Sequence, residues 1–367
     1  MNKVHTLHDA VAKYVESGDC LCIGGFTTNR KPYALVNEIL RQGQTDFTVW
    51  GGAAGGDADM LIGEGRVKAY INCYTANSGF TAVARRFRSA IEKGTLTYED
   101  YSQDVLMLQL HAASLGLPFL PVRLMQGSGL VKYWGISEEK RKTLDKVDNL
   151  KCVEMDNPFN PGEKVVCVPT PKLDLAIIHV QQASPDGTCI IVGDEFHDID
   201  IAIAARKAIV SCEELVSDEY IRQDPTKTRI FGECVKAVVH APFGAWPTQC
   251  YGKYDNDPIM LKEYDRASKY QDAEDAKAQL AKAAEKAAKA AEKAPEDVKL
   301  AEDAAKAAAA AKAAADGTKI PENFRDYMDK WVYSLKDHEQ LLEKVGAPRL
   351  VGLLNEPHLG YSIHRKQ

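Results

Sequence analysis

The sequence predicts an α/β protein built on an open, mainly parallel sheet with helices on both faces. Three observations favour this fold class. Apolar runs typical of buried strands alternate with amphipathic helical segments along much of the chain, a pattern that produces parallel sheets with crossover helices. Glycine-rich turns directly follow several of those runs. The chain has 367 residues with 45% hydrophobic content, enough to bury a large core.

The first strand and its turn are predicted at Cys20–Ile23 and Gly24–Gly25. A helical stripe precedes them between residues 4 and 16, with Thr6 as its N-cap, and a second helix follows over Ala34–Leu40. Open α/β sheets bind ligands at turns of this kind. The glycines let the backbone approach a ligand, and N–H groups at the helix start favour an anion. A plain tight turn explains two glycines equally well.

Two further strands are predicted to end in glycine-rich turns. The strand over Asp46–Trp50 ends in Gly51–Gly56, and the strand over Lys68–Tyr74 ends in Thr75–Gly79. The next helix carries three arginines that either meet a carboxylate or phosphate or form a solvated helix face: Arg85, Arg86 and Arg88. Neither G-x-G-x-x-G nor G-x-x-x-x-G-K-[ST] occurs, so no dinucleotide or P-loop nucleotide is indicated.

The remaining elements complete the α/β pattern. A helix is expected from Tyr101 through Ala113, and residues 131–165 form a polar excursion over the sheet. His179 lies in an apolar run, which favours a hydrogen-bonded core histidine over a catalytic one. Further strands are expected at residues 119–124, 173–180, 207–212, 235–240 and 349–354, with a Gly/Pro-rich loop at 241–250 and an amphipathic helix from residue 320 onward.

Composition divides the chain into three parts. Residues 1–271 form the α/β domain, residues 272–316 form an inserted helical hairpin, and residues 317–367 return to the α/β domain. The hairpin is almost entirely Ala, Lys, Glu and Asp, broken by Pro295, and these are mostly strong helix formers. It has too few large apolar residues to build a core, so we expect an arm that projects from the domain. Replacing it with a Gly/Ser loop should leave function intact.

The overall charge and the cysteines exclude several classes of protein. The net charge is -6 and no basic block stands out, which argues against a nucleic-acid partner. Nine cysteines are scattered singly with no C-x-x-C, as expected for reduced thiols in a cytoplasmic protein. The N-terminus is not a signal peptide, and no run of about 18 apolar residues could span a membrane.

Five stretches taken together resemble a known family. They are Gly24-Gly-Phe-Thr, Gly51-Gly-Ala-Ala-Gly-Gly-Asp57, Tyr70-Ile-Asn-Cys-Tyr-Thr-Ala-Asn-Ser-Gly79, Tyr101-Ser-Gln103 and Leu117-Pro-Phe-Leu-Pro121. They are similar to the family I CoA-transferases, in the branch of the glutaconate CoA-transferase α subunits. The resemblance covers residues 1–270 and 320–367; the hairpin has no counterpart in the family pattern.

The resemblance implies an activity and a partner. Such enzymes move CoA between acetyl-CoA and a dicarboxylic acid such as glutaconate or 2-hydroxyglutarate. A glutamate on a partner β subunit forms a glutamyl-CoA thioester, with the active site between the two subunits of an α2β2 assembly. The coenzyme A thioester is a substrate, and neither a bound cofactor nor a metal is implied.

The resemblance also implies roles for particular residues. The comparable strand here ends in Gly51-Gly52 instead of the nucleophilic glutamate, and Glu64 lies in a polar turn as a solvated residue, so we expect no activity from this chain alone. Gln103 is the expected oxyanion donor, with a helix-capping role as its alternative. The other implied site residues are Ser78 and Asn77 opposite the nucleophile, Gly24, Gly25 and Phe26 along the acyl group, and Arg30 or Lys31 at the distal carboxylate.

Two other functions stay open. A related CoA-ester hydrolase or ring-opening enzyme shares the fold and the division into subunits, but it needs no acceptor acid. A noncatalytic scaffold subunit would use its glycine turns only for packing against a catalytic partner, so loss of Gln103 would then matter little.

Overall fold

The computed structural model describes residues 2–356, 358, 359 and 361–363, and these form two compact units. The larger unit contains the residues up to 261 and from 336 onward, and the smaller unit contains Lys262–Leu335. The smaller unit therefore includes more residues than the predicted hairpin of residues 272–316. Its additional residues are the rest of α10 and the segment that carries α13, which pack together as described below.

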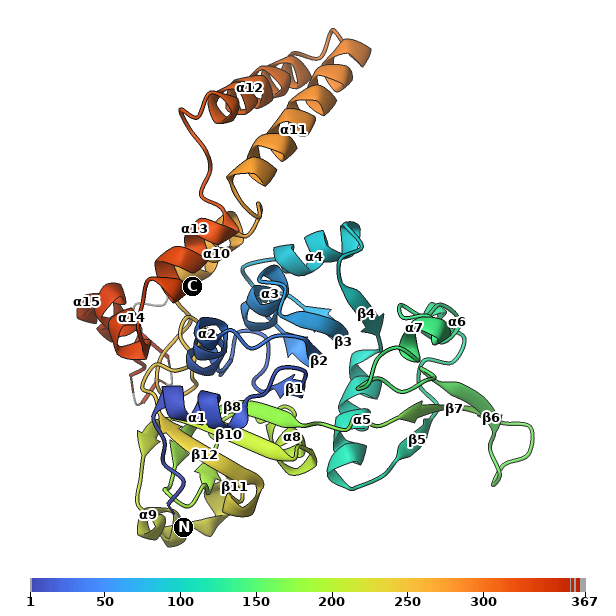
Figure 1. Ribbon diagram of the computed structural model, residues 1–367, viewed down its shortest axis with the longest axis vertical. Helices are drawn as coiled ribbons and strands as arrows, with labels where there is room; N and C mark the ends of the chain where they lie inside the picture. The colour runs from blue at the N-terminus through green and yellow to red at the C-terminus, as the bar shows by residue number, and fades with distance from the viewer. Residues whose placement is uncertain (1, 357, 360, 364–367) are drawn as a thin grey trace. The chain divides into compact units, whose positions relative to one another are not determined.

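The larger unit is built on a nine-stranded sheet (Figure 1). The strand order is β11-β9-β8-β1-β2-β3-β4, and β10 pairs with both β8 and β12. All pairings are parallel except those of β9 with β8 and β11. The strands are β1 Cys20–Ile23, β2 Phe47–Ala54, β3 Val67–Thr75, β4 Thr97–Asp100, β8 Leu175–Ala183, β9 Cys189–Ile190, β10 Lys207–Leu215, β11 Thr228–Ile230 and β12 Val235–His240.

Helices cover both faces of the sheet, as the sequence predicts (Figure 1). The crossovers α2 Tyr33–Gln42, α3 Gly56–Gly63 and α4 Arg85–Glu92 lie with α1 Leu7–Tyr14 on one face, and α5 Gln103–Ser114 and α8 Asp198–Ala204 lie on the other. Short helices complete the unit: α6 Gly129–Lys132, α7 Glu138–Arg141, α9 Asp218–Gln223, α14 His338–Val345 and α15 Ala347–Val351. The predicted N-cap of α1 is present, because Thr6 Oγ1 accepts a hydrogen bond from the Asp9 N–H at 3.1 Å.

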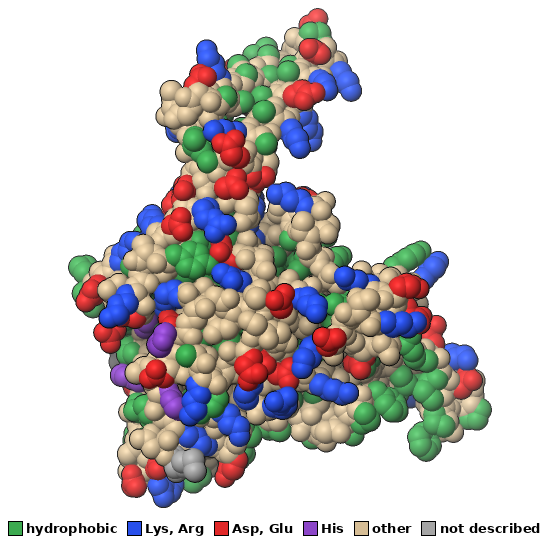
Figure 2. All heavy atoms as spheres, in the orientation of Figure 1, with side chains coloured by type: hydrophobic (Ala, Val, Ile, Leu, Met, Phe, Trp, Pro, Cys, Tyr) green, Lys and Arg blue, Asp and Glu red, His purple; other side chains and the backbone are tan. Residues whose placement is uncertain are grey.

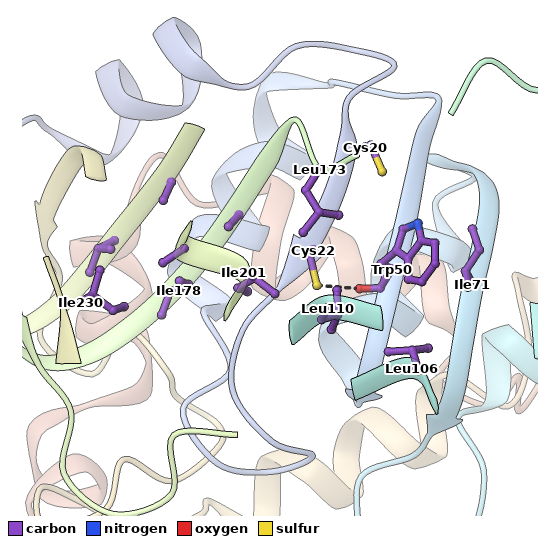
Figure 3. Packing of buried hydrophobic residues seen from close by; sticks show 14 of the residues in the cluster. Cys20, Cys22, Trp50, Ile71, Leu106, Leu110, Leu173, Ile178, Ile201 and Ile230 are labelled. Carbon is purple, nitrogen blue, oxygen red and sulfur yellow. Dashed lines mark hydrogen bonds between the residues drawn. The ribbon is translucent and has the colours of Figure 1, made fainter. Parts of the chain in front are cut away.

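The main core lies between the sheet and the α5 and α8 face. Figure 3 shows Leu106 and Leu110 of α5 close to Trp50 and Ile71, on β2 and β3. Burial of such a side chain contributes about 1.5–3 kcal/mol relative to leaving it exposed. The same buried cluster includes Cys20, Cys22 and Ile178. All nine cysteines are free thiols, and seven of them are buried.

His179 is a core histidine, as predicted. Its Nδ1 lies 2.9 Å from Ser211 Oγ and its Nε2 lies 2.6 Å from Glu213 Oε1. Tyr254 donates a hydrogen bond to the same carboxylate oxygen at 2.6 Å, and the Phe243 N–H donates to the other oxygen at 2.7 Å. This network ties β8 and β10 to the loop over residues 241–254.

Several predicted elements are wrong in extent or type. β2 runs through Gly51 and Gly52 to Ala54 instead of ending at Trp50, because glycine can continue a strand where a larger residue would collide with a neighbour. The expected strand at 119–124 is β5 Phe119–Val122, but it belongs to a separate antiparallel sheet with β7 Lys164–Pro169 and β6 Val153–Asp156, and β6 lies inside the expected polar excursion. The expected final strand at 349–354 is helix α15 followed by a turn. Helix α8 had no counterpart among the sequence-based predictions.

The smaller unit consists of helices. The predicted hairpin is formed by α11 Ala273–Lys293 and α12 Val298–Ala315, whose N-caps are Asp272 and Asp297. At its other end, Tyr264 of α10 Pro258–Ala267 packs on Tyr327 of α13 Phe324–Met328 with ring centroids 5.1 Å apart. Lys330 Nζ lies 2.8 Å from Glu263 Oε1. These contacts place residues 262–271 and 317–335 in the same unit as the hairpin.

Charge is mixed over the surface. Figure 2 shows Lys and Arg side chains interspersed with Asp and Glu over the visible face, without a continuous basic area. Among the three helix α4 arginines, Arg86 is buried and Arg88 forms an ion pair with Glu92 at 2.8 Å, so the cluster is not a uniformly solvated face. No helix in the described part of the chain is long and apolar enough to cross a membrane.

Shortening the hairpin should leave the larger unit equally stable. Replacing residues 277–313 with a Gly/Ser turn keeps the buried Ala276 and Ala314 and removes no residue of the sheet unit. Its free energy of unfolding should stay within about 0.5 kcal/mol, measured by urea unfolding followed through tryptophan fluorescence. A loss of several kcal/mol would show that the hairpin supports the sheet.

Candidate active site at the carboxyl ends of the strands

The predicted site residues gather at one edge of the sheet. Strands β1, β2, β3 and β4 are parallel neighbours, so their carboxyl ends meet at the same edge. The residues that follow or end them are Gly24, Gly25 and Phe26 after β1, Gly51 and Gly52 within β2, Asn77 and Ser78 after β3, and Gln103 after β4. This edge is where open α/β sheets place ligands.

The turn after β1 is held closed by the chain itself. Gly25 has φ +75°, and a Cβ there would lie 2.5 Å from the Arg30 carbonyl oxygen, so only glycine fits. Its N–H donates to Asp198 Oδ1 at 2.7 Å. The N–H groups of Gly24 and Phe26 donate to the carbonyls of Ile177 and Asn29. The N–H groups of these three residues are therefore already used within the chain; the expectation about the N–H groups at the start of the following helix stays a prediction.

Arg30 is engaged in a buried ion pair. The side chain is fully buried, and its guanidinium donates to Asp198 Oδ2 at 2.6 Å, to the His179 carbonyl at 2.9 Å and to the Asp194 carbonyl. Lys31 is equally buried, with Nζ 3.0 Å from Asp57 Oδ2. A buried charge requires such partners. Because both side chains are already paired inside the chain, this geometry argues against the prediction that either residue binds the distal carboxylate of a substrate.

Asn77 also has an internal role. It is buried, and its Oδ1 accepts a hydrogen bond from the Gly56 N–H at 2.8 Å, while Asp57 Oδ1 accepts from the Gly55 N–H at 2.8 Å. The N–H of the first residue of α3 and that of Gly55 before it are thereby both hydrogen-bonded. Ser78 is only half-buried, and its Oγ lies 3.0 Å from the hydroxyl oxygen of the exposed Tyr74.

Gln103 is exposed and lies at the first position of α5. The helix is capped by Ser102, whose side chain accepts from the Val105 N–H at 3.4 Å, so the capping alternative for Gln103 is not observed. Within the described ranges no hydrogen bond is made by the Gln103 amide. Its backbone is fixed by Tyr101, which stacks on Trp50 and donates its hydroxyl to the Lys151 carbonyl at 2.9 Å.

A buried ion cluster lies beneath this segment. Glu99 is fully buried with Arg141 and Lys151, whose Nζ lies 2.9 Å from Glu99 Oε1. Burial alone would raise the pKa of Glu99, but Lys151, the Gly135 N–H and Arg141 together lower it. Burial, and to a smaller extent the charge of the nearby carboxylates, raises the pKa of the Cys73 thiol to about 12. Cys73 is therefore a poor nucleophile.

No space exists for a nucleophilic side chain at the end of β2. A Cβ on Gly51 would lie 2.5 Å from the Tyr70 hydroxyl oxygen. A Cβ on Gly52 would lie 2.6 Å from His197 Cε1 and 3.1 Å from Phe196 Cε1. Glu64 follows the carboxyl end of α3, which returns the chain to the opposite edge of the sheet, so it is not a substitute.

Three site residues were missed in the sequence. Phe196, His197 and Asp198 lie where the chain enters α8, against Phe26, Gly52 and Gly25 respectively. His197 Nε2 lies 3.2 Å from the Ile23 carbonyl oxygen, and burial lowers its pKa to about 4. The signal that could have revealed them is the polar and aromatic run Asp194-Glu-Phe-His-Asp198 between two apolar segments.

A pocket of about 640 Å³ lies elsewhere. It is lined by the start of β8, the end of α5 and the segment over residues 145–148, at the amino-terminal edge of the strands. It contains none of the predicted site residues, so the site does not depend on it.

Comparison with known proteins identifies the family. The coenzyme A transferase family model matches residues 4–241. The chain is similar to the A subunit of glutaconate CoA-transferase from Acidaminococcus fermentans, at 56% identity over 363 residues that span 99% of this chain and 98% of the relative. The crystal structure of glutaconate CoA-transferase from that organism matches with a TM-score of 0.83 over 98% of both chains.

The chain belongs to the coenzyme A transferase family. The family assignment and the fold class expected from the sequence are both confirmed. A coenzyme A thioester is accordingly a substrate of the reaction in which a family member takes part. A more distant relative is the cholesterol ring-cleaving hydrolase IpdA subunit of Rhodococcus jostii, at 31% identity over 272 residues, 72% of this chain and 86% of the relative.

His197 should make this CoA-transferase chain less stable in mild acid. The unfolded chain binds a proton at His197 near the ordinary histidine pKa of 6.5, whereas the folded chain binds it only near pH 4. The contribution of the neutral His197 to the free energy of unfolding is therefore fully present above pH 6.5, and it decreases as the pH falls toward 4. Between pH 7 and pH 5 the wild type should lose about 2 kcal/mol more than His197→Asn.

Urea unfolding at pH 7, 6 and 5 measures this difference. His8→Asn, which removes an exposed histidine, is the matched control. Parallel pH dependences for wild type and His197→Asn would contradict a neutral, buried His197.

Proposed function

We propose that this chain is the α subunit of a two-subunit CoA-transferase that moves CoA between acetyl-CoA and a dicarboxylic acid such as glutaconate or 2-hydroxyglutarate. A partner β subunit carries the catalytic glutamate, in an α2β2 assembly. The identity of 56% to the A subunit of glutaconate CoA-transferase over 99% of this chain supports the proposal. The observation that carries it lies at the edge of the sheet where the strands end. Gly51 and Gly52 of β2 leave no room for a nucleophile, while Gln103, which follows β4 at the same edge, is exposed.

The chemistry is nucleophilic catalysis by a carboxylate. The partner's glutamate attacks the thioester carbonyl, the thiolate of coenzyme A leaves, and a mixed anhydride forms. The thiolate then attacks the glutamyl carbonyl, which releases the first acid and leaves a glutamyl-CoA thioester. A second carboxylic acid reverses both steps and departs as the new thioester, so no bond is hydrolysed.

Gln103 supplies an oxyanion donor to these steps. Each attack places negative charge on a carbonyl oxygen, and a fixed neutral N–H donor stabilises that charge without changing its own ionisation. The Gln103 amide is exposed, and its backbone is fixed by the buried Tyr101. Ser78, whose hydroxyl lies 3.0 Å from Tyr74, is the second donor that we assign to this edge.

Recognition of the second carboxylate belongs to the partner. Arg30 and Lys31 are buried and paired with Asp198 and Asp57. The carboxylates of Asp100 and Asp104 both contribute to the raised pKa of Cys73. Because these two residues are close to Gln103 in the chain, the surroundings of Gln103 carry negative charge. A dicarboxylate therefore needs a cation from the partner's side of the site.

Gln103→Ala in the assembled complex tests this function. Loss of one oxyanion donor should lower kcat for transfer from acetyl-CoA to glutaconate by roughly 10² or more, with a much smaller change in KM. Gln223→Ala, which removes an exposed glutamine of α9, is the matched control and should leave kcat unchanged. An intact, fully active Gln103→Ala complex would favour a scaffold role instead.

A further inference from the structure

Phe196 is a partly exposed aromatic residue next to the candidate site. The side chain is only half-buried. Its ring packs edge-on against Phe26 with centroids 4.7 Å apart, and its Cε1 lies 3.1 Å from the position that a Cβ on Gly52 would take. Phe26 follows β1 and Gly52 lies near the end of β2, so the two rings border the carboxyl ends of neighbouring strands.

The backbone of Phe196 is strained to hold this position. Its φ is +45°, a left-handed conformation that costs a bulky residue on the order of 1–3 kcal/mol. The surrounding contacts determine it: Asp194 Oδ1 accepts from the Phe196 N–H at 3.0 Å, and the Asp198 N–H donates to the Glu195 carbonyl at 3.0 Å. Such strain in a partly exposed residue is typical of functional sites.

The surface made by these rings is apolar. The Phe196 ring lies beside Gly52 and packs on Phe26, and the imidazole ring of His197 packs against Phe196 with ring centroids 4.4 Å apart. The buried charges of Arg30 and Asp198 neutralise each other at 2.6 Å. A surface of this kind suits the carbon chain of an acid, because contact with the rings removes apolar carbon atoms from water.

We propose that Phe26 and Phe196 form an apolar wall for the carbon chain of the acyl group, and that Phe196 determines which chains fit. The inference rests on the proposed CoA-transferase activity and adds a specificity-determining residue to its site. The ring of Phe196 limits the width of the acid beside the reacting carbonyl. A shorter side chain there makes room for a branched acid and removes contact with an unbranched one.

The test compares two acceptor acids in the assembled complex with acetyl-CoA as donor. The acids are glutaconate and 3-methylglutaconate, which has one additional methyl group. Phe196→Ala should lower kcat/KM for glutaconate by about 10-fold or more, and the ratio of the two kcat/KM values should shift at least 10-fold toward 3-methylglutaconate. Phe196→Leu, which keeps an apolar side chain on the same backbone, should shift the ratio in the same direction by less.

The controls separate the possible outcomes. Phe231→Ala removes another partly exposed phenylalanine, 61% exposed, and should not change the ratio. An equal loss for both acids, or no change with either Phe196 variant, would overturn the specificity role. If Phe196→Ala fails to assemble, Phe196→Leu alone decides the result. A wild-type complex that transfers CoA to neither acid would instead refute the proposed function, independently of Phe196.

Discussion

The carboxylate of Asp198 is the constraint on which the site edge depends. One oxygen accepts the Gly25 N–H at 2.7 Å and the other accepts from Arg30 at 2.6 Å, with both charged groups fully buried. Removal of one partner from such a pair typically costs about 3–5 kcal/mol, because the other charge stays buried and unpaired. The pair fixes the turn after β1, joins it to the start of α8, and so brings Phe26 and Phe196 together over Gly52.

Much of the fold follows from local patterns in the sequence. Cys20–Ile23 and Lys207–Cys212 are predictable as strands because fully buried strands are continuous apolar runs. The glycine turns also predict a candidate site at one edge of the sheet, where the structure brings the carboxyl ends of β1, β2, β3 and β4 together. The pairing of Arg30 with Asp198 is not predictable, since the two residues are 168 positions apart and no periodicity links them. Arg30 therefore resembles a ligand-binding residue in the sequence, whereas in the structure its charge is paired inside the chain. Phe196 was not predicted because it lies next to α8, which has only seven residues.

The distribution of charge suits one half of a shared site. Oxyanion stabilisation requires a neutral donor, and Gln103 follows two residues after Tyr101, whose hydroxyl is fixed on the Lys151 carbonyl next to the buried Glu99 ion pairs. Arg30 and Lys31, the positive side chains that follow the glycine turn, both form ion pairs inside the chain. In the proposed assembly, a partner supplies both the nucleophile and the cation that recognises a second carboxylate. This chain, which has no room for a nucleophile at Gly52, would then contribute only the remaining part of the site.

Reconstitution of acyl transfer tests this division of labour most directly. Transfer from acetyl-CoA to glutaconate would be measured with this chain alone, with its β partner alone, and with the two mixed, and the mixture would also be run on a sizing column. Activity only in a co-eluting mixture, and only when glutaconate is present as acceptor, is the expected result. Activity from this chain alone would contradict the absence of a nucleophile, and thioester breakdown without an acceptor would indicate a hydrolase.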